Sequence, residues 1–205
     1  AKAVFEARTR VLGAEHPQTL RSALNLSSLL AREDRFDEAL PLEARVLAAR
    51  RRLLGPDHPD TLFIQINHGV SLQRAGQSAR ALALLDDGLP RALRVLGEKH
   101  HHYQLGLMMS GQALLASGRV ARGIEVLARA LALRKASLPP DSPEIPNTAW
   151  ALVTALRGAG RDAEAQAVLT QDVAPLRAAA PDTLSAALRG RRGKIETKTR
   201  GGARR

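Results

Sequence analysis

The feature that most constrains this chain is a sequence period of 42 residues that holds over four successive copies. A Leu-Gly pair recurs at this step, and the fourth copy has Leu-Pro in its place: Leu12-Gly13, Leu54-Gly55, Leu96-Gly97 and Leu138-Pro139. A row of leucines and a row of small residues keep the same phase: Leu30, Leu72, Leu114 and Leu156, and Ala39, Ala81, Gly123 and Ala165. Because these rows stay in step without an insertion, the chain is predicted to be a tandem array whose units pack on their neighbours.

Each copy predicts two antiparallel helices. In the first copy, apolar residues recur with helical spacing at Leu20, Leu24, Leu26 and Leu30. A polar break follows, and in the later copies it carries a glycine, which suits the left-handed residue that ends many helices. A second helix is expected from about Asp37 to Leu53. The small residue at Ala39 lets the two helices cross closely, because a larger side chain would push them apart.

Two further patterns concern where these helices begin and end. The segments Asp57–Asp60 and Asp141–Glu144 each have an acidic residue followed by a proline, which predicts a helix start with an acidic cap and Pro in the first turn. Pro90 falls inside the second helix of its copy, where Ala48 and Ala132 stand in the others. We therefore expect a kink or an early break at Pro90.

The predicted fold is all-α, a right-handed α-solenoid of antiparallel helix pairs with one concave and one convex side. The array spans residues 1–188 and divides into a truncated preceding repeat, four repeats and a candidate closing helix: 1–17, 18–59, 60–101, 102–143, 144–180 and 181–188. Residues 189–205 are predicted to be a basic disordered tail. Since the chain opens in mid-pattern, we expect it to be part of a longer protein.

Charge is distributed unevenly along the sequence. The chain has a formal net charge of +11, but residues 189–205 hold eight basic residues and one acid, which leaves only +4 for residues 1–188. A solvated tail is the simpler interpretation, and weak contact with RNA or an anionic lipid surface is the alternative. The longest apolar run is only about five residues, so no membrane span is predicted. No signal peptide is recognisable, and a cytoplasmic protein is expected.

Several classes of chemistry find no support. The absence of cysteine excludes disulfides, thiol nucleophiles and cysteine zinc sites. His100, His101 and His102 invite a metal hypothesis, but adjacent residues point in different directions, so a degenerate linker is the better interpretation. The lone His68 is expected to be a hydrogen-bonded intruder on a packing face, and the neighbouring Asp86 and Asp87 do not converge on one site. No phosphate-binding loop or kinase signature occurs, so no catalytic residue, metal or cofactor is predicted.

A family resemblance rests on one stretch of the second copy and on residues that follow it in phase: Leu54-Gly55-Pro56-Asp57-His58-Pro59-Asp60-Thr61-Leu62, Asn67, Gly76 and Ala81-Leu82. This pattern resembles the tetratricopeptide repeat in its 42-residue form, the type of kinesin light chains and of many bacterial proteins. The resemblance covers residues 1 to about 180. His68 and Ser110 depart from it by replacing the apolar residue found at Leu26, and the third copy lacks the linker proline.

The resemblance implies protein recognition, usually of an extended peptide or a partner helix in a groove lined by the first helices. Carried over by phase, the groove would display Arg21, Asn25, Ser28 and Arg32 from the first repeat, Phe63, Asn67, Val70 and Arg74 from the second, and Met108 from the third. In related arrays the Asn of this row binds the peptide backbone; Met109 and Ala151 do not match it. Arginines beside Phe63 would suit an acidic peptide with a bulky apolar anchor. Alternatively, the Asn satisfies neighbouring backbone and the arginines are merely solvated.

Three functions follow in order of preference. The first is a non-catalytic scaffold that binds a protein or peptide in the concave groove and has no small-molecule substrate. The second is a C-terminal regulatory or docking region of a larger bacterial serine/threonine protein kinase or signalling regulator, since such proteins often carry these arrays. The third is nucleic-acid binding through the tail, which would be recognised by a steep dependence on salt.

Overall fold

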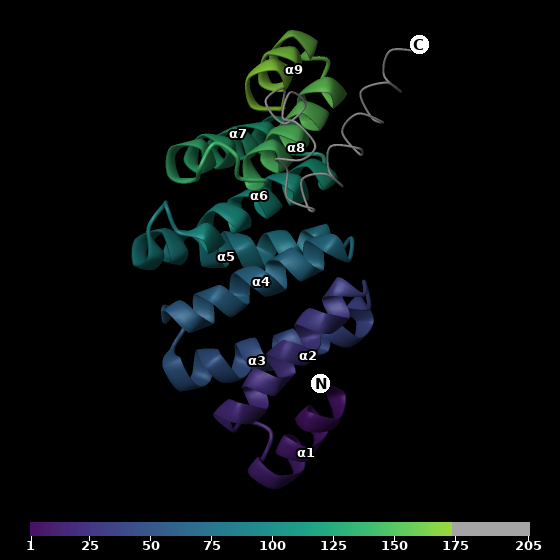
Figure 1. Cartoon of the computed structure of the whole chain (residues 1–205), viewed down its shortest axis with the longest axis vertical. Helices are drawn as coiled ribbons and strands as arrows, with labels where there is room; N and C mark the ends of the chain where they lie inside the picture. The colour runs from purple at the N-terminus through teal and green to yellow at the C-terminus, as the bar shows by residue number, and fades with distance from the viewer. Residues whose placement is uncertain (174–205) are drawn as a thin grey trace. The chain divides into compact units, whose positions relative to one another are not determined.

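The structure, a computed structural model, describes residues 1–173, and within that range it is all-α (Figure 1). Its helices are α1 (Lys2–Leu12), α2 (Pro17–Arg32), α3 (Phe36–Leu54), α4 (Pro59–Arg74), α5 (Ser78–Leu96), α6 (His101–Ala116), α7 (Val120–Ser137), α8 (Glu144–Gly158) and α9 (Asp162–Val168). A π-helical turn, Leu169–Val173, follows α9. Residues 174–180 of the last predicted repeat, the candidate closing helix 181–188 and the tail 189–205 lie outside the described residues.

The predicted helix pairs are present, and their starts follow the sequence period. The second helices α3, α5, α7 and α9 begin at Phe36, Ser78, Val120 and Asp162, which are 42 residues apart. The first helices α2, α4 and α6 begin at Pro17, Pro59 and His101 with the same step, and α8 begins one residue late at Glu144. The helix expected from about Asp37 to Leu53 is α3, so this prediction is confirmed.

The described chain falls into two compact units, Ala1–Gly123 and a second that starts at Ile124. In the first unit each second helix packs against the first helix of its own repeat and of the next, so that α3 lies on both α2 and α4, and α5 on both α4 and α6 (Figure 1). α1 packs on α2 in the place that a second helix of a preceding repeat would take. In the second unit α8 packs against α9 and the π-helical turn.

The row of small residues lies where helices cross, as predicted. Ala39 and Ala81 are completely buried, Ala39 among Leu26 and Leu30. The third member, Gly123, is tighter still, because a Cβ placed there would lie 2.8 Å from Leu115 and 3.0 Å from the Gly111 carbonyl oxygen. Close helix crossing is therefore the physical reason for small residues at this phase.

The helix caps differ from the prediction. The N-caps of α2, α4 and α6 are His16, His58 and His100, and in α2 and α4 the acidic residue before the histidine, Glu15 or Asp57, is not the cap. In each, the imidazole Nδ1 accepts a hydrogen bond from the backbone N–H two residues on, at 3.3, 3.1 and 3.3 Å. In α2 and α4 the proline that follows the histidine occupies the first helical position, which leaves the histidine as the N-cap. The prediction of an acidic cap was therefore wrong. In the fourth repeat Ser142 Oγ accepts from Glu144 N–H at 3.4 Å.

The first helices α2, α4, α6 and α8 are each followed by one residue with left-handed backbone. Gly76, Gly118 and Gly160 have φ of 75°, 76° and 72°, which confirms the prediction for the glycine of the polar break. In the first repeat Asp34 adopts the same conformation with φ 57°. A non-glycine residue is strained there, because its Cβ approaches the following carbonyl oxygen.

The early break expected at Pro90 is wrong, because α5 runs without interruption from Ser78 to Leu96. Proline removes one backbone hydrogen bond and crowds the preceding turn. On either side of it, however, Leu89 and Ala92 are buried against neighbouring helices. Tertiary packing holds the helix together across the proline, as it does across Pro41 in α3.

Candidate functional site

The clearest candidate surface is a polar row along α2. Arg21, Asn25, Ser28 and Arg32 recur at helical spacing, which places them on one side of the helix, and all four are exposed. Within the described residues none of these side chains has a hydrogen bond or ion pair to the rest of the chain. We call this row the α2 face. It presents two guanidinium groups, an amide and a hydroxyl to solvent without intramolecular partners.

The equivalent row on α4 is more covered. Phe63 keeps 40% of its surface exposed, while Asn67 and Val70 are half-buried. The Phe63 ring meets His102 of α6 edge to face, with ring centroids 4.4 Å apart. Phe63 is therefore already engaged on one side, and only its other side is open to a ligand.

Arg74, the last residue of this row, binds residues of the preceding repeat. Its guanidinium donates to the Ala31 carbonyl oxygen at 3.0 Å and to Asp34 Oδ1 at 2.9 Å, and it lies 5.1 Å from the centre of the Phe36 ring. These contacts fasten the end of α4 to the turn between α2 and α3. Arg74 is thus a structural residue as well as a candidate binding residue.

The row becomes inaccessible in the third repeat. Met108 and its neighbour Met109 are buried, with 9% and 8% of their surface exposed. Met108 therefore does not lie on an open face of α6, although its phase predicted it there. The reason is that α6 is apolar on most sides: ten of its residues are buried, more than in α2 or α4.

The inner side of α4 holds a buried polar cluster with α3. The Glu43 carboxylate accepts from Ser71 Oγ at 2.8 Å and lies 2.9 Å from His68 Nδ1. All three side chains are buried. The expectation that His68 is a hydrogen-bonded intruder is confirmed. Its carboxylate partner was missed, although Glu43 stands where the next two repeats have Leu85 and Leu127, which is a readable signal.

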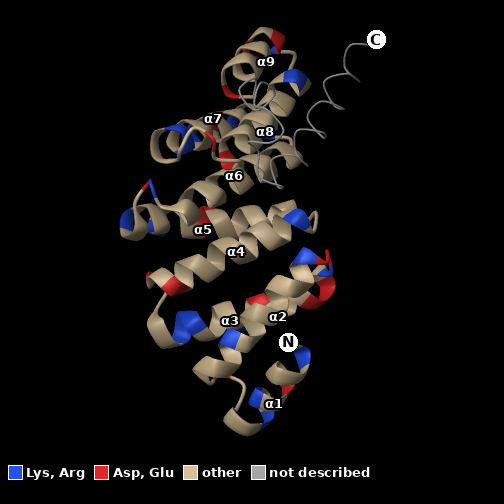
Figure 2. Ribbon diagram, viewed as in Figure 1, with Lys and Arg blue, Asp and Glu red and all other residues tan. Residues whose placement is uncertain are grey.

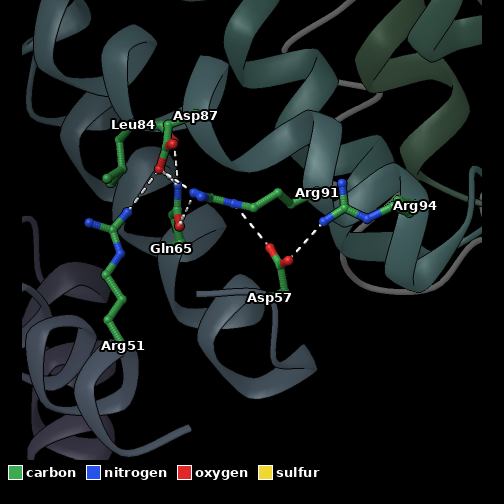
Figure 3. A network of polar contacts seen from close by, with 7 residues as sticks. All are labelled: Arg51, Asp57, Gln65, Leu84, Asp87, Arg91 and Arg94. Atoms are coloured by element: carbon green, nitrogen blue, oxygen red, sulfur yellow. Dashed lines mark hydrogen bonds and ion pairs between the residues drawn. The ribbon is translucent and has the colours of Figure 1, made fainter. Parts of the chain in front are cut away.

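A second polar network joins α3, α4 and α5 (Figure 3). The fully buried Gln65 amide donates to the Leu84 carbonyl oxygen at 2.8 Å and to Asp87 Oδ2 at 2.9 Å. Asp87 also binds Arg91 and, at 3.0 Å, Arg51. Burial alone would raise the pKa of Asp87, but the hydrogen bonds from Gln65 and Arg91 and the two guanidinium charges outweigh it and lower the pKa.

The same network contains the linker acid that was expected to cap α4. Asp57 pairs with Arg94 at 2.8 Å and with Arg91 at 3.6 Å (Figure 3). Equivalent residues do the same one repeat earlier, where Arg52 binds Glu15. The acidic linker residues therefore fasten second helices rather than cap first helices. Asp86 has no part in this network, which agrees with the view that Asp86 and Asp87 do not form a joint site.

An arginine contact recurs between second helices and the first helices that follow them. Arg8 of α1 donates to the Gln18 carbonyl oxygen and to Ser22 Oγ, at 3.3 and 2.7 Å. Arg50 pairs with Asp60 at 3.5 Å. In the second unit the buried Arg134 donates to the Glu144 carbonyl oxygen at 3.1 Å and Thr148 Oγ1 at 2.6 Å. Burial lowers the pKa of Arg134 and the Glu144 charge opposes this. We call these contacts the arginine clamps.

Charged residues of both signs are interspersed along the described helices (Figure 2). Over the same residues there is no group of three or more His, Asp or Glu side chains that could hold a metal ion. No helix in this part of the chain is long and apolar enough to cross a membrane. The α2 face is therefore the candidate site that the described residues offer.

Comparison with known proteins identifies a matching family model and similar solved structures. Residues 22–94 match the family model described as tetratricopeptide repeat. A crystal structure of a Podosopora anserina protein assigned as a kinesin light chain, with nearly identical TPR-like repeats, is 25% identical in sequence, with a TM-score of 0.69 over 83% of this chain and 81% of that one. A variant of the same protein has a TM-score of 0.71 at 25% identity, over 83% and 80% of the two chains.

The fold is also shared with a solved structure of lower identity. The crystal structure of BtubC (BKLC) from P. vanneervenii is 18% identical and has a TM-score of 0.68, over 82% of this chain and 68% of that one. No curated protein sequence matches this chain significantly. The expected all-α fold and the kinesin-light-chain-like form of the repeat are both confirmed.

Proposed function

Because this chain is built of tetratricopeptide repeats of the kinesin-light-chain-like form, we propose that it is a non-catalytic scaffold whose α2 face binds a peptide or partner domain. The observation that carries the proposal is the lack of intramolecular partners for Arg21, Asn25, Ser28 and Arg32 among the described residues. A side chain that stabilises the fold makes contacts within it, as Arg74 does. An exposed polar row without such contacts is available for a ligand.

The spacing of this row defines the ligand chemistry. Arg21 and Arg32 lie eleven residues apart on α2, which corresponds to about 16 Å along the helix. Asn25 and Ser28, between them, offer donors and acceptors that suit a peptide backbone. We expect an acidic partner with carboxylates at either end of this row, and an apolar side chain that reaches the open side of Phe63.

The test uses fluorescein-labelled acidic peptides of ten residues with one Leu or Trp at varied positions, measured by fluorescence anisotropy. Wild type should bind a subset, and Arg21→Glu with Arg32→Glu should weaken that binding by about tenfold or more, because two attractive charges become repulsive. The matched control is Lys2→Glu with Arg10→Glu, which makes the same charge change on exposed residues of α1. Equal losses in both double variants, with unchanged circular dichroism, would refute the α2 face.

The other two functions stay predictions. Regulation of a serine/threonine protein kinase concerns sequence beyond this chain, and nucleic-acid binding concerns residues 189–205, which lie outside the described residues. Salt separates the latter from the α2 face. Phosphate neutralisation by several Lys and Arg gives a steep fall of affinity with ionic strength, whereas a site with an apolar anchor is far less sensitive.

A further inference from the structure

The segments that precede α2, α4 and α6 are equivalent in phase but differ in charge. An acid, a capping histidine and a proline precede or open the first two helices, as Glu15-His16-Pro17 and Asp57-His58-Pro59. Before α6 the same positions read Lys99-His100-His101, and His102 follows. The acid next to the capping histidine is thus replaced by a lysine, and the proline by another histidine. Glu98 stands one residue before this lysine, and it is not among the groups that shift the pKa of His102.

The arginine clamp is also missing at this place. Arg8, Arg50 and Arg134 share one phase, and the equivalent residue of α5 is Ala92, which is completely buried. The partner position, held by Asp60 in α4, is His102 in α6. The contact between α5 and the start of α6 therefore lacks the polar fastening that the other repeats use.

A histidine cluster takes its place. The His102 ring lies 5.4 Å from that of His100 and 5.2 Å from that of His101, and it packs against Phe63 of α4 at 4.4 Å. His102 is half-buried, and its Nδ1 is a buried atom without a hydrogen-bond partner. His100 Nδ1 caps the helix by accepting from His102 N–H. Three imidazoles thus meet at the positive end of one helix.

The surroundings of His102 make a positive charge unfavourable. Burial, reinforced by the charges of His101 and His100, lowers the pKa of His102 to about 4. From α4 it faces the uncharged Phe63, and Asp60, three residues before Phe63 in α4, is paired with Arg50. From α5 the clamp position offers Ala92, while Arg91 and Arg94 are paired with carboxylates of their own. Among the described residues His102 has no ion pair.

Protonation affects this turn in two ways. Positive charges on neighbouring rings repel one another and also oppose the helix dipole, which is positive at an N-terminus. A charged His102 must leave its half-buried place beside Phe63 to be solvated. At α2 and α4 only one histidine is present, and an acidic residue adjoins it.

From this arrangement we propose that the start of α6 is an acid-sensitive joint: mildly acidic solution detaches its first turn from Phe63 and α5, while α2 and α4 stay fastened. The joint would uncover the second side of Phe63 at the same time. It rests on the contact of His102 with Phe63 and on the cluster of histidine rings at 100–102, and does not depend on any ligand of the α2 face.

The experiment is hydrogen exchange of the intact chain followed by mass spectrometry, corrected for the intrinsic effect of pH on exchange. Between pH 7.5 and 5 the protection of amides in the first turn of α6 should fall by about tenfold or more. At pH 5 a solvated imidazole with its ordinary pKa of 6.5 is protonated, whereas His102 in the closed turn, with a pKa of about 4, is not, so acid favours the open turn. Peptides that cover the first turns of α2 and α4 should keep their protection.

The decisive variant is Lys99→Glu with His101→Pro and His102→Gln, which gives this segment the residues that the chain itself has at 15–18. It should keep its protection at pH 5, and His102→Gln alone should keep most of it. Uniform protection at pH 5 in wild type, or an undiminished acid response in the triple variant, would overturn the proposal. Loss of protection in all three first turns at once would also overturn it, because that indicates general acid unfolding.

Discussion

The helices α2 and α4 occupy equivalent places in consecutive repeats, yet their outer sides are used differently. On α2 the row from Arg21 to Arg32 has no partner within the described chain. On α4 two of the four residues of the same row already make contacts within the chain: Phe63 packs on His102, and Arg74 binds the turn between α2 and α3. Equal phase thus fixes where a side chain points, while its neighbours decide whether it is available for binding.

Their inner sides differ as well. α2 packs with leucines, of which Leu26 stands where α4 has His68. α4 instead buries His68 and Ser71 against Glu43 of α3. A buried polar cluster tolerates little change, because each member satisfies another. The interface of α3 with α4 therefore adds a buried hydrogen-bonded cluster to its apolar packing of Leu40 with Leu72. The corresponding part of α2 packs through Leu26 and Leu30.

The largest effect is expected from Glu43→Leu, which copies Leu85 at the equivalent position of the next repeat. It leaves His68 and Ser71 buried without their acceptor and should lower the free energy of unfolding by about 3–5 kcal/mol. Replacing all three residues, with His68→Leu and Ser71→Ala in addition, should recover most of this loss. Urea unfolding followed by circular dichroism measures both, and a triple variant no more stable than Glu43→Leu would contradict the cluster.

The second prediction concerns how the free energy of unfolding depends on pH through His102, which packs on Phe63. Since the pKa of His102 lies at about 4 in the folded chain against an ordinary 6.5, the unfolded chain binds the extra proton first. The contribution of neutral His102 to the free energy of unfolding is therefore complete above about pH 6.5 and is lost as the pH falls from there towards 4. Because His102 is only half-buried, we expect a loss of about 1–2 kcal/mol. Thermal unfolding against pH should show a shallower acid decline in His102→Gln.

The third prediction compares Arg32 and Arg74, the arginines that end the rows on α2 and α4. Arg74→Ala removes a hydrogen bond to the Ala31 carbonyl and a contact with Phe36, and should destabilise by about 1 kcal/mol. Arg32→Ala should change stability by less than about 0.5 kcal/mol, because Arg32 has no partner in the described chain. If chemical denaturation gave the two variants equal losses, the contrast between α2 and α4 would disappear.

The smallest effect is expected at the turn that Arg74 fastens. Asp34 has left-handed backbone, so Asp34→Gly should relieve strain of about 1 kcal/mol while losing the exposed pair with Arg74. In wild type we expect a net gain of about 0.5 kcal/mol, and in an Arg74→Ala background the full gain. Differential scanning calorimetry of the four proteins separates the two terms, and a loss of stability in both backgrounds would disprove the strain.

Much of the fold could be predicted from the sequence because its determinants are periodic. Rows such as Leu30 or Ala39 repeat four times, and each repetition reinforces the same helix position. The left-handed residue at Gly76 and the start of α3 follow from local rules of helix ends. Of the kink or early break expected at Pro90, the early break was wrong because a local rule was applied where tertiary packing decides.

The site could be predicted only in part, for a physical reason. The phase of Arg21 or Arg74 places both on the same row, but whether either has a partner depends on a turn that lies about forty residues away in sequence. The histidine caps were missed because imidazole is an uncommon cap, although His16, His58 and His100 recur at one phase. Met108 was assigned to the surface because phase alone does not reveal how deeply α6 is buried.

Site-specific photocrosslinking tests most directly whether the α2 face binds an acidic peptide. A photoreactive phenylalanine analogue at Ser28, in the middle of the row, should crosslink to the selected acidic peptide, and unlabelled peptide should compete with it. The same analogue at Ala48, which is exposed on α3, should not crosslink. Crosslinking at Ala48 and none at Ser28, with both proteins folded, would show that the peptide does not bind the α2 face.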